Sequence, residues 1–114
     1  MAILLNQTVS LPSGLYNSPA VAMPLGDHNV ELSCSRNNWP VGGVDLHVRA
    51  SFDGGLVYND LDPMHIPAWV DDGTGKHPLS NAVIGFGWNT PPTHVKAKIV
   101  SPSAFSSVVK ISTS

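Results

Sequence analysis

Charged residues are scarce in this chain. Asp, Glu, Lys and Arg together make up 12% of its 114 residues, which is about half the share found in typical soluble domains. With few charged side chains to hydrate it, part of the surface is expected to be covered by a partner in an assembly. The net charge of −2 gives no electrostatic basis for binding nucleic acid or an anionic membrane, so neither is expected as a partner.

Cysteine and long apolar runs are also scarce. The single cysteine, Cys34, excludes a disulfide within the chain, and its place in an alternating stretch predicts a small buried side chain. The N-terminus is apolar only over residues 2–5 and lacks the basic start of a secretion signal. That run is also far too short to span a bilayer. We therefore expect no signal peptide and no transmembrane segment.

Helical patterns are missing as well. Ten Gly and ten Pro interrupt the chain, and no stretch repeats apolar residues at helical spacing. Apolar and polar residues alternate instead, which is typical of half-buried strands. The clearest stretch places these residues on one expected inner face: Val44, Leu46, Val48, Ala50 and Phe52. Its opposite face, with Asp45, His47 and Arg49, is expected to be a hydrated strand face or a protein contact. Further alternating stretches cover residues 4–11, 19–25, 29–35, 82–88, 93–100 and 105–113.

This pattern predicts an all-β fold, a single antiparallel β-sandwich or jelly roll of about seven or eight short strands. One domain is expected to span residues 1–114. Residues 1–27 are predicted to form an N-terminal arm and edge strands, because prolines interrupt them, and residues 28–114 the core of the sandwich. Residues 59–79 lack clear alternation and predict one long loop, which in a compact domain is usually functional.

The long loop carries acidic and histidine side chains, but their spacing matches no metal site. They are Asp60, Asp62, His65, Asp71, Asp72 and His77. Calcium loops need carboxylates at short, regular spacing, and zinc needs a convergent set of His or Cys. The chain also has no G-x-S-x-G elbow or other context for a catalytic triad. We therefore expect no metal, no cofactor and no enzymatic activity.

The three tryptophans suggest different roles. Trp88 shares its alternation with Ile84 and Phe86, which predicts burial in the core. Trp39 precedes Pro40 and is expected to cap one end of the sandwich. Trp69 stands in the long loop and is the one good candidate for exposure, where it could stack on a sugar or anchor a protein interface.

A short motif follows the clearest strand. Residues 51–58, SFDGGLVY, fit the Ser-x-Asp-x-Gly-x-x-aromatic pattern of the Asp-box in sialidases and related β-propellers. A propeller needs several four-stranded blades, and this chain is too short for them and has one copy of the motif. The motif is therefore expected to be a structural hairpin turn. Asp53 would bind backbone amides, and either Asp53-Gly54 or Gly54-Gly55 would supply the positive φ angles. Its residues are Ser51, Asp53, Gly54 and Gly55.

Two longer segments carry a family resemblance. They are HNVELSCSRNNWPVGGVDLHVRASFDGG, residues 28–55, and HVKAKIVSPSAFSSVVKIST, residues 94–113. A strand, a Trp-Pro turn and a strand ending in Ser-x-Asp-Gly-Gly resemble the small jelly-roll or sandwich structural proteins of tailed bacteriophages, notably capsid decoration (cement) proteins. Where that family often carries Trp after the turn, this chain has Tyr58. The resemblance implies a non-enzymatic virion protein, made in the host cytoplasm, that binds the outside of the capsid, often as a homotrimer. It would bridge major capsid protein subunits.

Two segments are expected to make the contacts with the capsid and with other copies. The N-terminal segment and the loop 59–79 are both apolar and short of regular structure. The candidate contact residues are Leu4, Leu5, Leu15, Tyr16, Met64, Ile66 and Trp69. Two alternatives stay open, a sandwich domain of the phage tail or baseplate and a carbohydrate-binding module.

Overall fold

Strands make up most of the part of the chain that the structure describes. A computed structural model describes residues 2–35, 39–40, 42–61, 64–66, 69–71, 76–78 and 81–114. These residues form strands, turns and connections but no helix, as the alternating pattern predicts. The strands are β1 (Ala2–Leu11), β2 (Gly14–Asn17), β3 (Val21–Ala22), β4 (Asn29–Ser35), β5 (Val44–Ser51), β6 (Asn59–Asp60), β7 (Met64–Ile66), β8 (Trp69–Asp71), β9 (Lys76–Pro78), β10 (Asn81–Gly87), β11 (His94–Ser101) and β12 (Phe105–Thr113).

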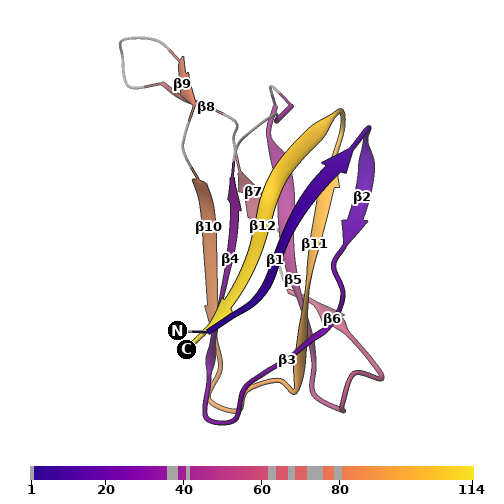
Figure 1. Cartoon of the computed structure of the whole chain (residues 1–114), viewed down its shortest axis with the longest axis vertical. Coiled ribbons are helices and arrows are strands. Elements are labelled where there is room, and N and C mark those ends of the chain that lie inside the picture. Colours follow the sequence, from indigo (N-terminus) through magenta and orange to yellow (C-terminus); the bar gives the residue numbers. More distant parts are fainter. Residues whose placement is uncertain are drawn as a thin grey trace.

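The long strands form two antiparallel sheets (Figure 1). The first sheet has the order β1-β12-β4-β10. The second has the order β2-β11-β5-β6, with β3 added to β11 and β7 added to β5. The strands β8 and β9 pair only with each other among the described residues and project beyond the end of the first sheet. The predicted all-β, antiparallel β-sandwich is confirmed.

The core lies between the two sheets and follows the alternation of the strands. In β5 and β11 the side chains that face the first sheet are apolar and almost fully buried, as Val48 and Ala97 illustrate. Leu32 of β4 and Val109 of β12 meet them from the opposite sheet within the same apolar cluster. Cys34 is buried in this cluster, as its position in the sequence predicts.

Phe52 does not belong to the buried inner face that was predicted for the strand at residues 44–52. The strand β5 ends at Ser51, so alternation stops one residue earlier than expected, and 49% of Phe52 remains exposed. The four other residues of that face are buried.

The N-terminal segment is more regular than expected. The strand β1 is ten residues long and pairs with β12 along its length, interrupted only by an irregularity at Leu4. The strand β2 then forms the edge of the second sheet. The edge strands are therefore as predicted, but the expected irregular arm is absent from residues 2–17, because the backbone of these strands pairs with β12 and β11.

Segment 59–79 is also more regular than one long loop. Its described residues include β6 and β7, which both pair with β5, and the hairpin of β8 and β9. Strands of two or three residues are too short for alternation to be visible in the sequence. Tertiary pairing with the long strand β5 determines their conformation instead.

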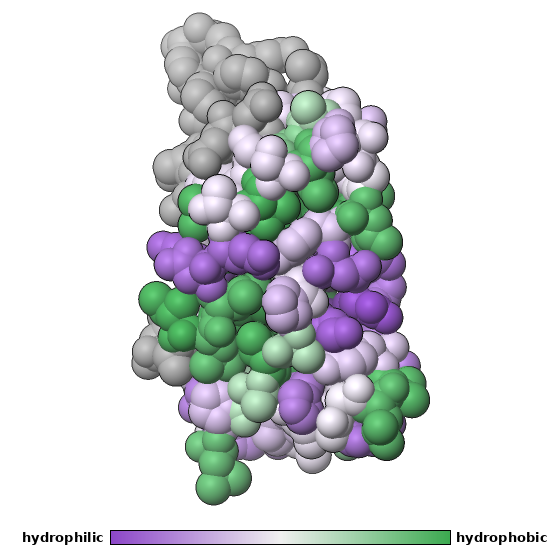
Figure 2. Space-filling view, turned by 45° about the vertical axis from the view of Figure 1, so that its right-hand side comes forward, coloured by the Kyte–Doolittle hydropathy of each residue, from purple (hydrophilic) through white to green (hydrophobic). Residues whose placement is uncertain are grey.

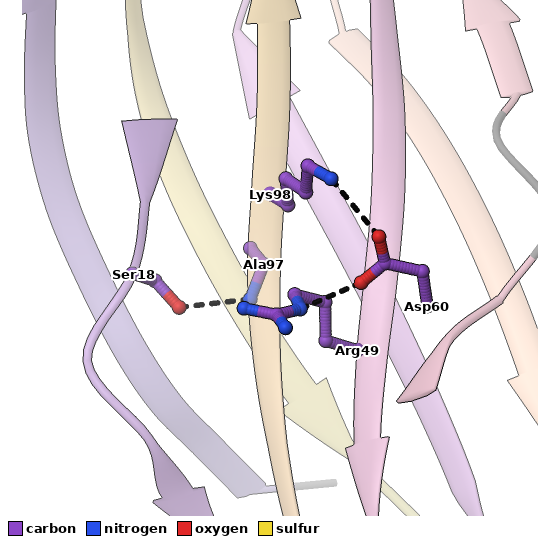
Figure 3. A network of polar contacts seen from close by, with 5 residues as sticks. All are labelled: Ser18, Arg49, Asp60, Ala97 and Lys98. Carbon is purple, nitrogen blue, oxygen red and sulfur yellow. Dashed lines mark hydrogen bonds and ion pairs between the residues drawn. The ribbon is translucent and has the colours of Figure 1, made fainter. Parts of the chain in front are cut away.

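Ser18 continues the ladder between β2 and β11 after β2 has ended. Its backbone N–H donates to the carbonyl of Ala97 at 2.9 Å, and its hydroxyl oxygen accepts from the Ala97 N–H at 2.8 Å (Figure 3). The same hydroxyl donates to the carbonyl of Pro19 at 3.0 Å. Ser18 is 4% exposed, so this hydroxyl replaces a backbone acceptor at a place that water does not reach.

Removal of the Ser18 hydroxyl should lower the stability of the fold by a measurable amount. In Ser18→Ala the N–H of Ala97 loses its acceptor inside the protein, and an unsatisfied buried donor costs about 1–3 kcal/mol. The midpoint of urea unfolding should fall accordingly, while the exposed neighbour Ser13→Ala should change the free energy of unfolding by less than about 0.5 kcal/mol. Equal midpoints for the two variants would contradict the role given to this hydroxyl.

Candidate functional site

Residues 51–58, which we call the Asp53 loop, connect β5 to β6 and are held by one carboxylate. The Oδ1 atom of Asp53 accepts hydrogen bonds from the Leu56 N–H at 3.1 Å and from the Val57 N–H at 3.0 Å. It also accepts the hydroxyl of Ser51 at 2.8 Å, and the Ser51 oxygen in turn accepts the N–H of Gly55 at 2.9 Å. The predicted bonding of Asp53 to backbone amides is confirmed.

The turn itself differs from a tight hairpin. Gly54 and Gly55 have φ angles of +81° and +94°, which glycine adopts without the steric cost of a Cβ atom. Of the two expected pairs, Gly54-Gly55 is therefore the one that supplies the positive φ angles. Strand pairing resumes only at Asn59, so the connection is a wide loop and needs the Asp53 bonds to keep its shape.

Hydrogen bonds also tie the Asp53 loop to the connection that precedes β11. The Gly54 N–H donates to the Oγ1 atom of Thr93 at 3.0 Å, and that hydroxyl donates to the carbonyl of Ser51 at 3.1 Å. The Thr93 N–H donates to the same carbonyl at 2.8 Å. The loop is therefore fixed to the end of the second sheet as well as within itself.

The Asp53 loop exposes three large apolar side chains. Phe52 is 49% exposed, Leu56 84% and Val57 58%. A loop already held in one conformation loses little conformational entropy when it binds a partner. Figure 2 shows one face of the protein, on which apolar and polar residues gather in separate patches. Sequence reasoning missed these residues, although the apolar pair that follows Asp-Gly-Gly could have indicated them.

Polar side chains cover the outer face of the second sheet beside this loop. Arg49 of β5 and Lys98 of β11 both reach Asp60 of β6 (Figure 3). The Arg49 Nε atom lies 2.6 Å from Oδ1 of Asp60, and the Lys98 Nζ atom lies 2.9 Å from Oδ2. The hydrogen bond from Lys98 lowers the pKa of Asp60 below its usual value, with a smaller contribution from Arg49, against an opposing effect of burial.

Tyr58, the last residue of the Asp53 loop, connects the loop to these cations. The Nζ atom of Lys96 lies 4.3 Å from the centroid of the Tyr58 ring, and the Arg49 guanidinium lies 5.9 Å from it. Both distances are within the range of cation–π attraction. We call Arg49, Lys96 and Lys98, with Asp60 and Tyr58, the cation cluster. The outward position predicted for Arg49 is confirmed, since its neighbours on β5 point into the core.

A second charged pair lies at the other end of this face. The Nδ1 atom of His65 lies 2.7 Å from the Oδ1 atom of Asp45, and its Nε2 atom lies 2.7 Å from the carbonyl of Gly42. Both partners are acceptors, so the ring satisfies both contacts only when both nitrogens carry a proton. The Asp45 carboxylate, and next the Gly42 carbonyl, raise the pKa of His65 above its usual value.

The predicted contact residues occupy several different environments. Leu5 and Tyr16 are half-buried against the core, and the Tyr16 hydroxyl donates to Gln7. Leu4 is half-buried. Leu15 and Met64 are exposed, but they lie on β2 and β7, which β11 and β5 separate in the sheet. The side chains of Ile66 and Trp69 lie outside the described part of the structure.

The two described tryptophans pack on the protein itself. Trp39 lies against Phe105 with ring centroids 5.4 Å apart, and its Nε1–H donates to the carbonyl of Ser35 at 3.0 Å. Trp88 stacks on Phe86 at 6.4 Å. Both tryptophans are half-buried against the core cluster, so Trp88 is less buried than its alternation predicts. The ring partner of Trp39 is Phe105.

The described residues offer neither a metal site nor a membrane-spanning helix. They contain no group of three or more His, Cys, Asp or Glu side chains that could hold a metal ion. In the same part of the chain, no helix is long and apolar enough to cross a lipid bilayer. Comparison of the sequence with protein-family models and with curated proteins gives no match.

The Asp53 bonds predict how the loop responds to substitution. In Asp53→Ala the amides of Leu56 and Val57 lose their acceptor, so their hydrogen exchange should become roughly three- to tenfold faster. Asp53→Asn keeps a side-chain oxygen and should show a smaller change. The measurement is amide exchange by NMR, with the strand amide of Val48 as an internal control.

Acid should reproduce the effect of Asp53→Ala in the wild-type protein. Hydrogen bonds from Val57 and Ser51 lower the pKa of Asp53, so the carboxylate stabilises the loop above its unfolded pKa of about 3.9. That stabilisation is lost as the pH falls through the lower pKa of the folded state. Exchange at Leu56 that is equally slow in Asp53→Ala would contradict this account.

The His65 contacts predict a pH dependence of the opposite sign. A raised pKa means that His65 stabilises the fold fully below its unfolded pKa of about 6.5 and that this contribution is lost as the pH rises through the folded value. NMR titration should place the His65 pKa above about 6.5, and Asp45→Asn should lower it. The exposed His28, titrated in the same spectra, gives the comparison. A His65 pKa that is unchanged by Asp45→Asn would contradict the assignment of Asp45 as the main cause.

Proposed function

We propose that this protein is a structural protein of a phage particle, a capsid decoration protein that binds the outside of the shell and stabilises contacts between major capsid subunits. The observation that carries the proposal is the Asp53 loop. It combines a fixed backbone with three exposed apolar side chains, a combination that suits binding to a preformed protein surface. The resemblance of residues 28–55 to the decoration proteins includes the first part of this loop, residues 51–55.

The low charge of the chain supports the same function. Only 12% of its residues are charged, and apolar groups at the surface are stabilised when a neighbouring subunit covers them. In a symmetric shell each contact can be weak, because many copies and several contacts per copy act together. Assembly as a homotrimer would multiply the contacts of each unit in the same way. A place in the tail or baseplate would rest on the same contacts and differs only in location.

A carbohydrate-binding module is the alternative from another class. Such a module would present aromatic rings as flat exposed platforms. Trp39 and Trp88 instead pack against Phe105 and Phe86 and are half-buried, which leaves less of each ring for a sugar. Tryptophan fluorescence that shifts saturably with one glycan of a panel would favour this alternative over the proposed function.

Binding to capsids tests the proposal directly. Purified protein mixed with undecorated capsids of the phage that encodes it should cosediment with them and saturate. Leu56→Ser should weaken the binding roughly ten- to hundredfold, because burial of a leucine side chain contributes about 1.5–3 kcal/mol. Val83→Ser is the matched control, since Val83 is equally apolar and 53% exposed on the first sheet.

Three outcomes are distinguishable. Absence of saturable binding to capsids would overturn the proposed function. Equal loss of binding in the two variants would overturn the Asp53 loop as the contact element. Labelled protein that appears on tails and not on shells in electron micrographs would place it in the tail or baseplate.

A further inference from the structure

The cation cluster holds half of the basic residues of the chain. The sequence contains six Lys and Arg residues in all, and Arg49, Lys96 and Lys98 occupy adjacent outward positions on β5 and β11. The register pairs Lys96 directly with Arg49, and Lys98 follows on the same face of β11. A protein with a net charge of −2 therefore concentrates positive charge on one part of one sheet.

The negative charge within the cluster does not balance these cations. Asp60 is shared by Arg49 and Lys98. Lys96 makes no ion pair with any described residue, and its ammonium group lies over the Tyr58 ring. Like charges directly opposite each other destabilise an antiparallel strand pair. The pair of Lys96 and Arg49 is therefore expected to reduce folding stability, and carboxylates from outside the molecule would offset that cost.

The cation cluster is continuous with the Asp53 loop. Tyr58 belongs to the loop and lies against both Lys96 and Arg49. Tyr58 and His94 both lie close to Gly55, where a Cβ atom would be 3.3 Å from the Tyr58 hydroxyl and 3.7 Å from Nδ1 of His94. A ligand that contacts the cations therefore lies beside Tyr58, the residue that directly follows the exposed Leu56 and Val57 in the chain.

We propose that the cation cluster binds an acidic segment of a partner protein whose carboxylates lie beside apolar side chains. The carboxylates would pair with Lys96 and Lys98, and the apolar neighbours would cover Phe52 and Leu56. This inference deepens the proposed function and rests on it for the identity of the partner as a protein of the particle. The apolar component of the surface favours a protein over nucleic acid or an acidic glycan, because both of those present mainly polar and charged groups.

A short blocked peptide of alternating Glu and Val tests this chemistry without a capsid. Titrated into ¹⁵N-labelled protein at low salt, it should shift the amide signals of Arg49, Lys96 and Lys98 saturably. Lys96→Gln should weaken the binding roughly two- to fivefold, the range measured for single exposed ion pairs. About 1 M salt should remove most of it, because the screening length is then roughly 3 Å. The same peptide with Gln in place of Glu should not bind measurably.

The matched control is Lys110→Gln. Lys110 is also a half-buried lysine in the middle of a strand, but it lies on the first sheet opposite Asn6 and Ser33. This variant should bind the Glu-Val peptide as the wild type does. Lys96→Arg keeps the charge and should retain binding. Lys96→Gln removes both the like-charge pair with Arg49 and the cation–π contact with Tyr58. These two effects have opposite signs, so the variant should melt near the wild-type temperature and its weaker binding would not reflect unfolding.

Several results would overturn the inference. One such result is a Glu-Val peptide that shifts the amide signal of Lys110 as strongly as that of Lys96. Another is a peptide affinity that is the same for Lys96→Gln and the wild type. Tighter binding of heparin or single-stranded DNA than of the Glu-Val peptide at equal charge would identify a site for anionic polymers instead.

Capsid binding separates this inference from the proposed function. If capsids bind the wild type and Lys96→Gln equally well at every salt concentration, the inference fails and the proposed function stands. If the Glu-Val peptide binds as expected but capsids do not bind the wild type, the proposed function fails. The preference of the cation cluster for acidic segments then still stands.

Discussion

The pairing of β5 with β11 is the interaction on which the other features of this protein depend. Seven residue pairs join the two strands, from His94 and Ser51 to Val100 and Asp45. Alternation within each strand buries Val48 and Ala97 between the sheets and forces their neighbours outward. The same register that completes the core therefore brings Lys96 opposite Arg49 on the outer face.

The Asp53 loop depends on this pairing as well. The register places the end of β5 beside the start of β11, so that Thr93 can bond to both Ser51 and Gly54. Asp53 then fixes the rest of the loop through the amides of Leu56 and Val57. The Asp53 loop, with its exposed apolar side chains, and the cation cluster thus meet at Tyr58.

Local pattern in the sequence was sufficient for the parts of the fold that depend on one strand at a time. Alternation predicted the buried residues of β5 from Val44 to Ala50, and the Asp-Gly-Gly sequence predicted a turn held by Asp53, although not its width. Features that depend on the register between strands could not be predicted from local pattern. Arg49 and Lys98 are distant in the sequence, and their contact through Asp60 follows from the pairing of β5 with both β11 and β6.

The limits of alternation explain the corrections. Phe52 continues the alternation of β5 in the sequence, but β5 ends at Ser51. The Ser51 hydroxyl binds Asp53 and the Gly55 N–H, so Phe52 belongs to the loop and not to the strand. The short strands β6 and β7 form because they pair with the edge of β5 that β11 does not occupy. Local preferences of residues 59–66 could not indicate this pairing. The contact residues predicted from apolar composition also included Leu5 and Tyr16, which the core uses for packing.

We propose that the outer face of the second sheet, with the Asp53 loop, is the side of this protein that faces a partner. A cryo-electron microscopy map of decorated capsids that resolves side chains tests it most directly. We expect Leu56 and Phe52 to be buried against a major capsid subunit, with a carboxylate of that subunit within ion-pair distance of Lys96. A map in which the first sheet contacts the shell while Lys96 and the Asp53 loop face solvent would contradict the account.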